Sequence, residues 1–98
     1  MSTEPVVGVF DLDQGWRLHP SVSVRPERFG ALLYHFGTRR LSFLKSPGLL
    51  TVVRSLAETA SAREACRLAG VSDAELPAYA TALATLANSQ MIQARVSS

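Results

Sequence analysis

Residues 16–45, WRLHPSVSVRPERFGALLYHFGTRRLSFLK, decide the fold of this chain, because apolar residues recur there in short runs between turn-forming residues. Residues 22–25 alternate valine with serine and arginine, which is the period of a half-buried strand, and Pro26 is expected to end that strand. Residues 31–36, ALLYHF, are almost wholly apolar and indicate the central strand of a sheet.

A third strand is expected over residues 39–44, RRLSFL, after a turn at residues 37–38. Leu41 and Phe43 share one face of this strand. The other face carries Arg40, Ser42 and Leu44. The two arginines fit two interpretations: charges that protect a sheet edge from aggregation, or cations that steer and grip an acidic peptide. A small sheet that ends on a basic, apolar strand is open to a partner, which indicates binding rather than catalysis.

Helices should follow the sheet, and each has a start signal. Ser46 supplies a capping hydroxyl and Pro47 a proline at the first helical position. One apolar stripe then continues through Leu49, Val52, Val53, Leu56 and Ala57. Residues 61–64 form a capping box for a short second helix, which Gly70 should end in a left-handed conformation.

The third helix is expected after a second capping box at residues 72–75, and it should stop near Asn88. It carries Leu76, Tyr79, Ala80, Leu83, Leu86 and Ala87. Pro77 removes one helical hydrogen bond, so we expect either a distorted first turn or a start nearer Leu76. The many alanines keep this helix thin, which should leave space between it and the third strand. Residues 91–92 fit a last short extended segment.

Cys66 lies four positions before Gly70, and so small a residue at this spacing lets two helices cross closely, as in a helix-turn-helix. The order of elements therefore predicts an α+β fold class. More specifically, it predicts a winged helix-turn-helix-like domain, with a three-stranded antiparallel sheet followed by three helices. Residues 16–95 should form this single domain, and residues 1–15 a flexible or docked N-terminal segment.

The 98 residues, 47% of them hydrophobic, suffice for one modest core and leave little room for a deep catalytic cleft. A net charge of +2 is too small to indicate nucleic acid by itself. Nine of the ten basic residues are arginine, which slightly favours an acidic partner. No apolar run approaches the ~18 residues of a membrane span. With a single cysteine the chain forms no internal disulfide, so we expect a cytoplasmic protein without membrane contact.

The residues that often carry chemistry give no catalytic site here. His19 and His35 lack partners at metal-binding spacing, and Cys66 lies on the apolar side of its helix, as a buried thiol does. Asp11 and Asp13 lack a third ligand. Neither a nucleophile elbow nor a phosphate-binding loop occurs. We therefore expect no enzyme activity, no cofactor and no metal.

A winged helix often belongs to a transcription regulator, which is the alternative function to test. Its recognition helix enters the major groove with basic or amide side chains. Here no arginine or lysine lies between Arg67 and Arg95, and Asp73 and Glu75 add negative charge where the third helix begins. Because phosphate neutralisation dominates DNA affinity, this helix would repel DNA, and we expect no nucleic-acid partner.

Four segments together resemble the mycofactocin-system peptide chaperones, a family of PqqD-like recognition elements (RiPP recognition elements) that serve ribosomally made, modified peptides. The segments are WRLHP (16–20), VRPE (24–27), FGALLY (29–34) and RLSF (40–43), and the resemblance covers about residues 10–95. It implies a small non-catalytic protein that captures the leader of a precursor peptide and presents it to a radical S-adenosylmethionine (radical SAM) enzyme. In mycofactocin biosynthesis that enzyme acts on the C-terminal Val-Tyr of the precursor. Its iron–sulfur clusters would belong to the enzyme, since this chain lacks the cysteines to hold one.

In such elements the leader adds a strand beside the third strand, in the groove against the third helix. By element order, the resemblance carries peptide binding to Arg39, Arg40, Leu41, Ser42, Phe43, Leu44, Leu76, Tyr79, Ala80 and Leu83. The implied partners are the leader peptide and the radical SAM maturase. An exposed edge strand also permits pairing between copies, so a monomer or weak dimer is expected.

Overall fold

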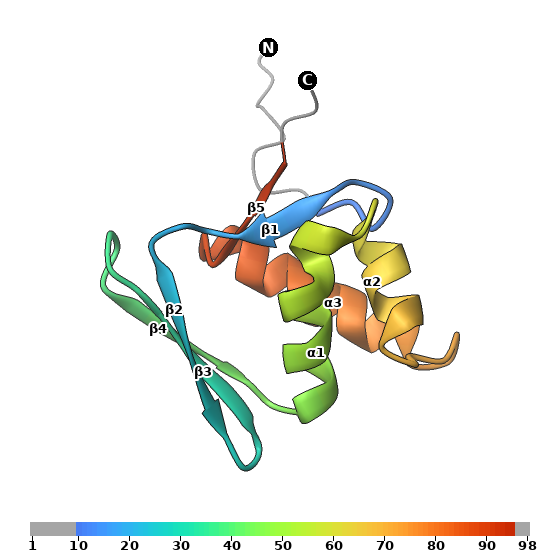
Figure 1. The fold of residues 1–98 in the computed structure, drawn as a ribbon, viewed down its shortest axis with the longest axis horizontal. Coiled ribbons are helices and arrows are strands. Elements are labelled where there is room, and N and C mark those ends of the chain that lie inside the picture. The colour runs from blue at the N-terminus through green and yellow to red at the C-terminus, as the bar shows by residue number, and fades with distance from the viewer. Residues whose placement is uncertain (1–9, 96–98) are drawn as a thin grey trace.

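The computed structural model describes residues 10–95, and the N-terminal segment expected over residues 1–15 lies partly outside them. In chain order the elements are β1 (Trp16–Leu18), β2 (Val22–Glu27), β3 (Gly30–His35), β4 (Arg40–Leu44), α1 (Pro47–Ser55), a 3₁₀ turn η1 (Leu56–Glu58), α2 (Ala62–Leu68), α3 (Leu76–Asn88) and β5 (Ile92–Ala94). Figure 1 shows the sheet on one side and the helices on the other. The expected α+β class, with three antiparallel strands and three helices, is confirmed.

The main sheet has the order β2-β3-β4, so the apolar run of β3 is central, as expected. Two boundaries differ from expectation. Pro26 does not end β2 but lies inside it, opposite Ala31. Proline is tolerated there because β2 is an edge strand, where a residue needs no N–H on its free side. Arg39 belongs to the β3–β4 turn, with a φ of 64°, and β4 begins one residue later.

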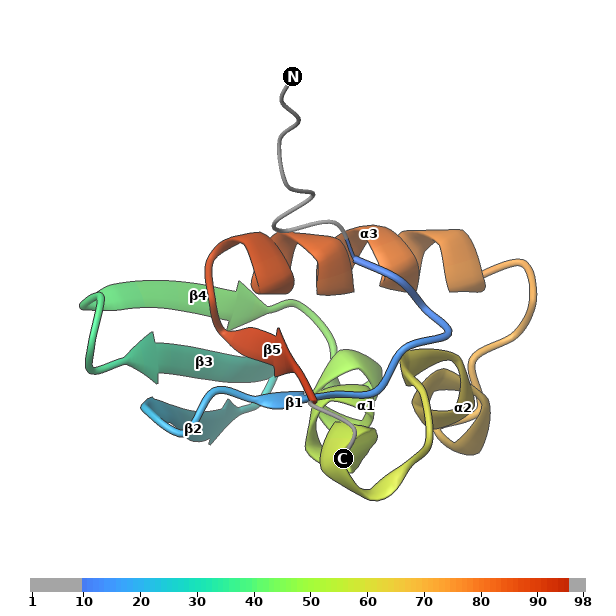
Figure 2. The same ribbon diagram turned by 90° about the horizontal axis from the view of Figure 1, so that it is seen from above.

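A second sheet has two strands, β1 and β5, which lie near opposite ends of the described sequence. Trp16 pairs with Ala94 and Leu18 with Ile92, so the expected extended segment at the C-terminal end becomes a strand with a defined partner. Trp16, Met91 and Ile92 are buried in the core. This sheet holds the two ends of the described chain together and closes the core over α1 and α3 (Figure 2).

The helix signals of the sequence act as expected. Ser46 caps α1, and its Oγ accepts a hydrogen bond from the Leu49 N–H at 3.1 Å. Ser61 caps α2 by accepting from the Glu64 N–H at 3.1 Å. Gly70 takes a φ of 84° after α2, and the Val71 N–H donates to the Cys66 carbonyl at 3.0 Å, which is the hydrogen bond of a Schellman motif.

Helix α3 begins at Leu76, which is the later of the two starts that the sequence left open. The Ser72 Oγ accepts from the Glu75 N–H, and the Glu75 carboxylate accepts from the Ser72 N–H, so the expected box forms a turn just before the helix. Pro77 therefore lies in the first turn, where its missing N–H breaks no helical hydrogen bond. The helix ends at Asn88, as expected.

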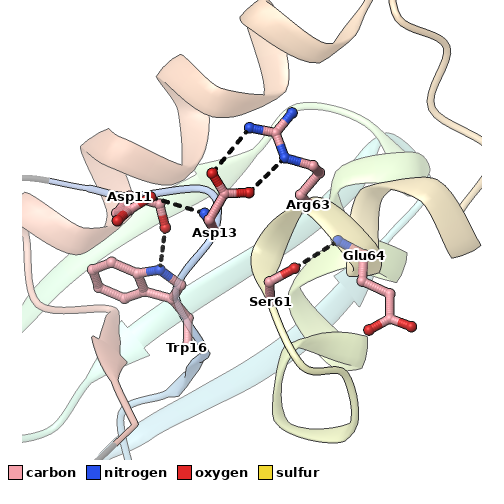
Figure 3. Close-up of polar contacts among 6 residues, drawn as sticks. All are labelled: Asp11, Asp13, Trp16, Ser61, Arg63 and Glu64. Atoms are coloured by element: carbon pink, nitrogen blue, oxygen red, sulfur yellow. Dashed lines mark hydrogen bonds and ion pairs between the residues drawn. The ribbon is translucent and has the colours of Figure 1, made fainter.

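The segment that precedes β1 is docked on α2 (Figure 3). The Trp16 indole N–H donates to the Asp11 carbonyl at 2.9 Å, and the Arg63 Nε donates to Asp13 Oδ1 at 2.7 Å. This hydrogen bond is the main reason that the pKa of Asp13 lies below its ordinary value and that of Arg63 above. The pair is exposed, so it orients the segment more than it stabilises the fold.

Among residues 10–95, none of the helices combines the length and the apolar character that crossing a membrane requires.

Candidate functional site

Strand β4 has only one strand neighbour among the described residues, so one of its edges is free. The direction of its amides follows from the sheet. The Phe36 N–H donates to the Ser21 carbonyl at 2.9 Å, so the even-numbered residues of β3 turn their amides toward β2 and the odd-numbered ones turn theirs toward β4. In β4 the partners of the odd-numbered residues are Arg40, Ser42 and Leu44. The N–H and C=O groups of Leu41 and Phe43 therefore point to the free edge.

A groove runs along this free edge, lined by residues of β4 and α3. Figure 2 shows these two elements side by side. The groove has a volume of about 340 Å³. It is lined by Ser42, Phe43, Leu44, Lys45, Leu49, Ala78, Thr81, Ala82, Thr85 and Leu86. An adjoining hollow of about 270 Å³ continues it past Ser46 to Tyr79. The space that the alanines of α3 were expected to leave beside the third strand is therefore present.

The wall of the groove on α3 consists mainly of small side chains. Ala78, Thr81, Ala82 and Thr85 lie at spacings of three and four, and so on one face of the helix. None of these four residues was assigned to peptide binding from the sequence. Their signal in the sequence is the pair of threonines, four residues apart, in a helix made mostly of alanine and leucine.

The residues of α3 to which the resemblance carried peptide binding lie around the groove in different ways. Tyr79 lines the adjoining hollow. Ala80 lies on the opposite side of α3, in a shallow hollow shared with Phe10 and Asp13. Leu83 is fully buried and belongs to the core, and Leu76 is half-buried beside Cys66. Tyr79 is thus the one member of this set that the structure brings to the groove.

On the strand, Ser42, Phe43 and Leu44 lie in the groove wall. Leu44 is fully buried and forms the floor with Leu49. Leu41 is 58% exposed and directs its side chain to the outer face of the sheet, so only its backbone faces the groove. Arg39 lies in the β3–β4 turn and Arg40 is the first residue of β4; both are exposed and lie beyond the groove lining.

Gly30 lies against the segment that leaves β4 for α1. A Cβ at this residue would collide with the Leu44 carbonyl oxygen and come within 2.9 Å of the Ser46 N. Only glycine allows the start of β3 to pack this closely against the chain that leaves β4 for α1. The close packing brings the Ser46 cap, and with it the first turn of α1, to one end of the groove.

The other candidates of the sequence form no reactive centre. Cys66 is buried, and burial raises the pKa of its thiol. The rings of His19 and His35 are in contact, tilted by 45° with centroids 4.4 Å apart, which the sequence spacing did not indicate. His35 Nδ1 accepts from the N–H groups of Gly37 and Thr38, and so fixes the turn before β4. No group of three metal-binding side chains exists within residues 10–95.

Comparisons with known proteins give the same family throughout. Residues 15–93 match the model of the peptide chaperone MftB family. The chain is 62% identical over 85 residues to the peptide chaperone MftB of Mycobacterium ulcerans (strain Agy99), which covers 87% of this chain and 78% of the relative. It is 59% identical over 86 residues to that of Mycobacterium tuberculosis (strain ATCC 25618 / H37Rv), with 88% and 79% covered. Against that of Mycolicibacterium smegmatis (strain ATCC 700084 / mc(2)155) the identity is 53% over 93 residues, with 94% and 91% covered. No solved structure matches.

Proposed function

The chain belongs to the peptide chaperone MftB family, and from that premise we propose that it binds the leader of a ribosomally made precursor peptide at β4 and delivers it to a radical SAM maturase in mycofactocin biosynthesis. The family role is that of a peptide chaperone and not of an enzyme. The binding mode, the leader and the maturase are the parts that we propose.

One observation carries the binding mode: the free amides of Leu41 and Phe43 open onto a groove whose far wall is made of alanine and threonine. A peptide that adds a strand there gains backbone hydrogen bonds at every second residue. Its alternate side chains would point into the groove, toward Leu44, Leu49 and α3. Small residues on α3 leave room for those side chains.

The free energies of binding indicate how much the groove must contribute. Four backbone hydrogen bonds contribute ~2–6 kcal/mol, and ordering a flexible leader costs about 2–5 kcal/mol. These nearly cancel, whereas micromolar affinity needs ~8 kcal/mol. At ~25 cal/mol per Å², about 300 Å² of buried apolar surface supplies the difference. The leader should therefore carry two or three apolar side chains spaced two residues apart, as a strand presents them to one face.

We propose that the arrangement of strands and helices is winged-helix-like. The charges of α3 nevertheless argue against DNA binding. Asp73 and Glu75 are exposed where α3 begins, and no arginine or lysine lies on that helix. Retention on duplex DNA at low salt is the measurement that would favour the alternative. A single buried cysteine fits a reducing cytoplasm, where precursor peptides are made.

The test is amide hydrogen exchange by NMR, with and without a synthetic leader peptide. Strand addition at β4 should slow exchange at Leu41 and Phe43, whose amides face the free edge. Arg40, Ser42 and Leu44 already donate to β3, so their protection should change little. Chemical-shift changes are expected in residues 39–44 and along Ala78, Thr81, Ala82 and Thr85. A saturating leader that leaves Leu41 and Phe43 unprotected would refute this binding mode.

A further inference from the structure

The outer face of the main sheet, which points away from the helices, is apolar and uncovered. Strand β3 contributes Leu32 and Tyr34 to this face, and Phe36 follows directly after the strand. Strand β4 contributes Leu41 and Phe43, and the β2–β3 turn contributes Phe29. Phe36 is 63% exposed, Phe43 61% and Phe29 49%. In Figure 1 no described helix or strand lies over this face, whereas the opposite face packs on α1.

These side chains form one patch and not scattered exposures. Leu32 pairs with Phe43 across the strands, and Tyr34 pairs with Leu41. The Phe29 and Phe43 rings lie 6.2 Å apart between centroids, and Tyr34 meets Phe36 edge to ring at 4.9 Å. Single exposed apolar residues need no explanation, but a contiguous patch of aromatic and aliphatic side chains is typical of an interaction surface.

The patch is bordered by positive charge. From Val22 to Lys45 the chain holds five basic residues, of which Arg40 lies on the opposite face of the sheet, and one acidic residue, Glu27. Arg25 lies on the same face, opposite Leu32, and its contact with Glu27, 3.3 Å long, is exposed. In the sequence Arg28 precedes Phe29, and Lys45 lies two residues after Phe43. The surface thus has an apolar centre and a basic rim.

We propose that this outer face docks a protein partner whose own surface has an apolar centre bordered by carboxylates, and that this partner is the maturase. The inference rests on the proposed function for the identity of the partner. Charge complementarity across such an interface would speed and orient docking. A strand added at Leu41 and Phe43 would extend the same face, because its alternate side chains would continue the patch. The maturase would then meet the peptide and its carrier on one continuous surface.

Other occupants fit the face less well. In a symmetric dimer each copy would use the same patch, and the basic rims would oppose each other. Single-stranded nucleic acid stacks on open aromatic faces, whereas here Tyr34 and Phe36 pack edge to ring and two of the six apolar residues are leucines. The leader itself has its backbone partners at the edge of β4 and not on this face.

The experiment measures binding of the chain to the purified, cluster-loaded maturase and, separately, to the leader peptide. Phe36→Glu and Arg25→Glu each alter an exposed side chain of the face and leave the groove intact. Each should weaken maturase binding by about tenfold or more and leave leader affinity unchanged. The matched controls are Leu68→Glu and Arg67→Glu on α2, where Leu68 is 69% exposed. Both controls should bind the maturase like the unaltered chain.

Each other result has a definite meaning. Unaltered maturase binding by Phe36→Glu and Arg25→Glu would overturn the inference. The inference would also fail if the unaltered chain bound the leader but not the maturase. If Phe36→Glu instead abolishes self-association in sedimentation, or binding of a labelled single-stranded oligonucleotide, the face belongs to that other occupant. A chain that binds the maturase through this face but fails to bind the leader at β4 refutes the proposed binding mode alone.

Discussion

The two edges of the main sheet differ in how many hydrogen-bond donors they leave free. On β2 the residues that face outward are Val22, Val24 and Pro26. The Val22 N–H already donates to the His19 carbonyl at 2.9 Å, and Pro26 has no N–H. Val24 is left as the one free donor of that strand. On β4 both outward residues, Leu41 and Phe43, keep theirs.

The two edge strands also differ in whether a helix lies beside them. Figure 2 shows α3 alongside β4, whereas no described helix runs beside β2. Natural sheets often block an edge with proline, charge or a covering segment to prevent unwanted pairing. In this chain β2 carries a proline, an arginine and a glutamate, which are residues that discourage pairing. The edge of β4 instead borders a groove. The difference supports the proposal that a peptide adds to β4, where α3 would limit the size of what can enter.

The largest effect is expected from removing one free donor of β4. Leu41→Pro deletes an outward N–H without removing a hydrogen bond to β3, because Leu41 directs its amide to the free edge. A leader carbonyl left unpaired costs about 1–3 kcal/mol, which weakens binding by roughly fivefold to a hundredfold. Isothermal titration with the leader peptide measures the change.

The matched control for this change is Leu41→Ala. It removes the same exposed side chain and keeps the N–H, so leader affinity should stay near that of the unaltered chain. Pro26→Val offers the converse test on β2, since it adds an outward donor at the blocked edge. Equal losses for Leu41→Pro and Leu41→Ala would show that the side chain, and not the edge of the strand, binds the leader.

The next effect concerns which face of α3 closes the open edge. Ala78→Trp places an indole in the groove, where Ala78 is exposed, and should weaken leader binding by about tenfold. Ala80→Trp adds the same ring on the other side of α3, toward Phe10, and should change leader affinity little. If Ala80→Trp blocked binding and Ala78→Trp did not, the leader would use the face first expected from the resemblance.

The local signals of the sequence sufficed for most of this architecture. Ser46, Ser61 and Gly70 each determine a helix boundary through hydrogen bonds within a few residues, so their patterns could be interpreted without the rest of the chain. The apolar run of β3 likewise marked the central strand. Pro26 was misjudged because a proline ends a central strand but not an edge strand, and edges are defined only once the sheet is assembled.

The features that escaped prediction depend on distant parts of the chain. Strand β1 is three residues long and exists because β5 pairs with it from the far end of the domain. The resemblance carried the groove face of α3 to Leu76, Tyr79, Ala80 and Leu83 by element order, and the alanines of this helix give no stripe that marks one side. Only packing distinguishes Leu83, which is fully buried, from Thr81 and Thr85.

A smaller effect is expected from the charges at the turn that leads into β4. Reversing both in Arg39→Glu with Arg40→Glu should weaken binding of an acidic leader by about fivefold at low salt, because exposed charges act mainly by steering. The loss should shrink at high salt, where screening removes most of this attraction. Arg54→Glu with Arg67→Glu makes the same change in net charge on α1 and α2. Losses that match this control at every salt concentration would mean that only the net charge matters.

The smallest effect concerns the segment that blocks the β2 edge, since His19 supplies the carbonyl that accepts from Val22. Burial lowers the pKa of His19 below its ordinary 6.5, and His35 and Arg17 lower it further. The unfolded chain therefore binds more protons in this window, so stability should fall as the pH drops below about 6.5 and level off once the folded imidazole is also protonated. Urea unfolding at several values between about pH 5 and pH 7.5 measures this slope. In His19→Asn the amide oxygen replaces the Nδ1 that accepts from the Ser21 N–H at 3.0 Å, and this contribution to the slope should disappear. An identical slope in both proteins would mean that a group other than His19 causes the pH dependence of stability.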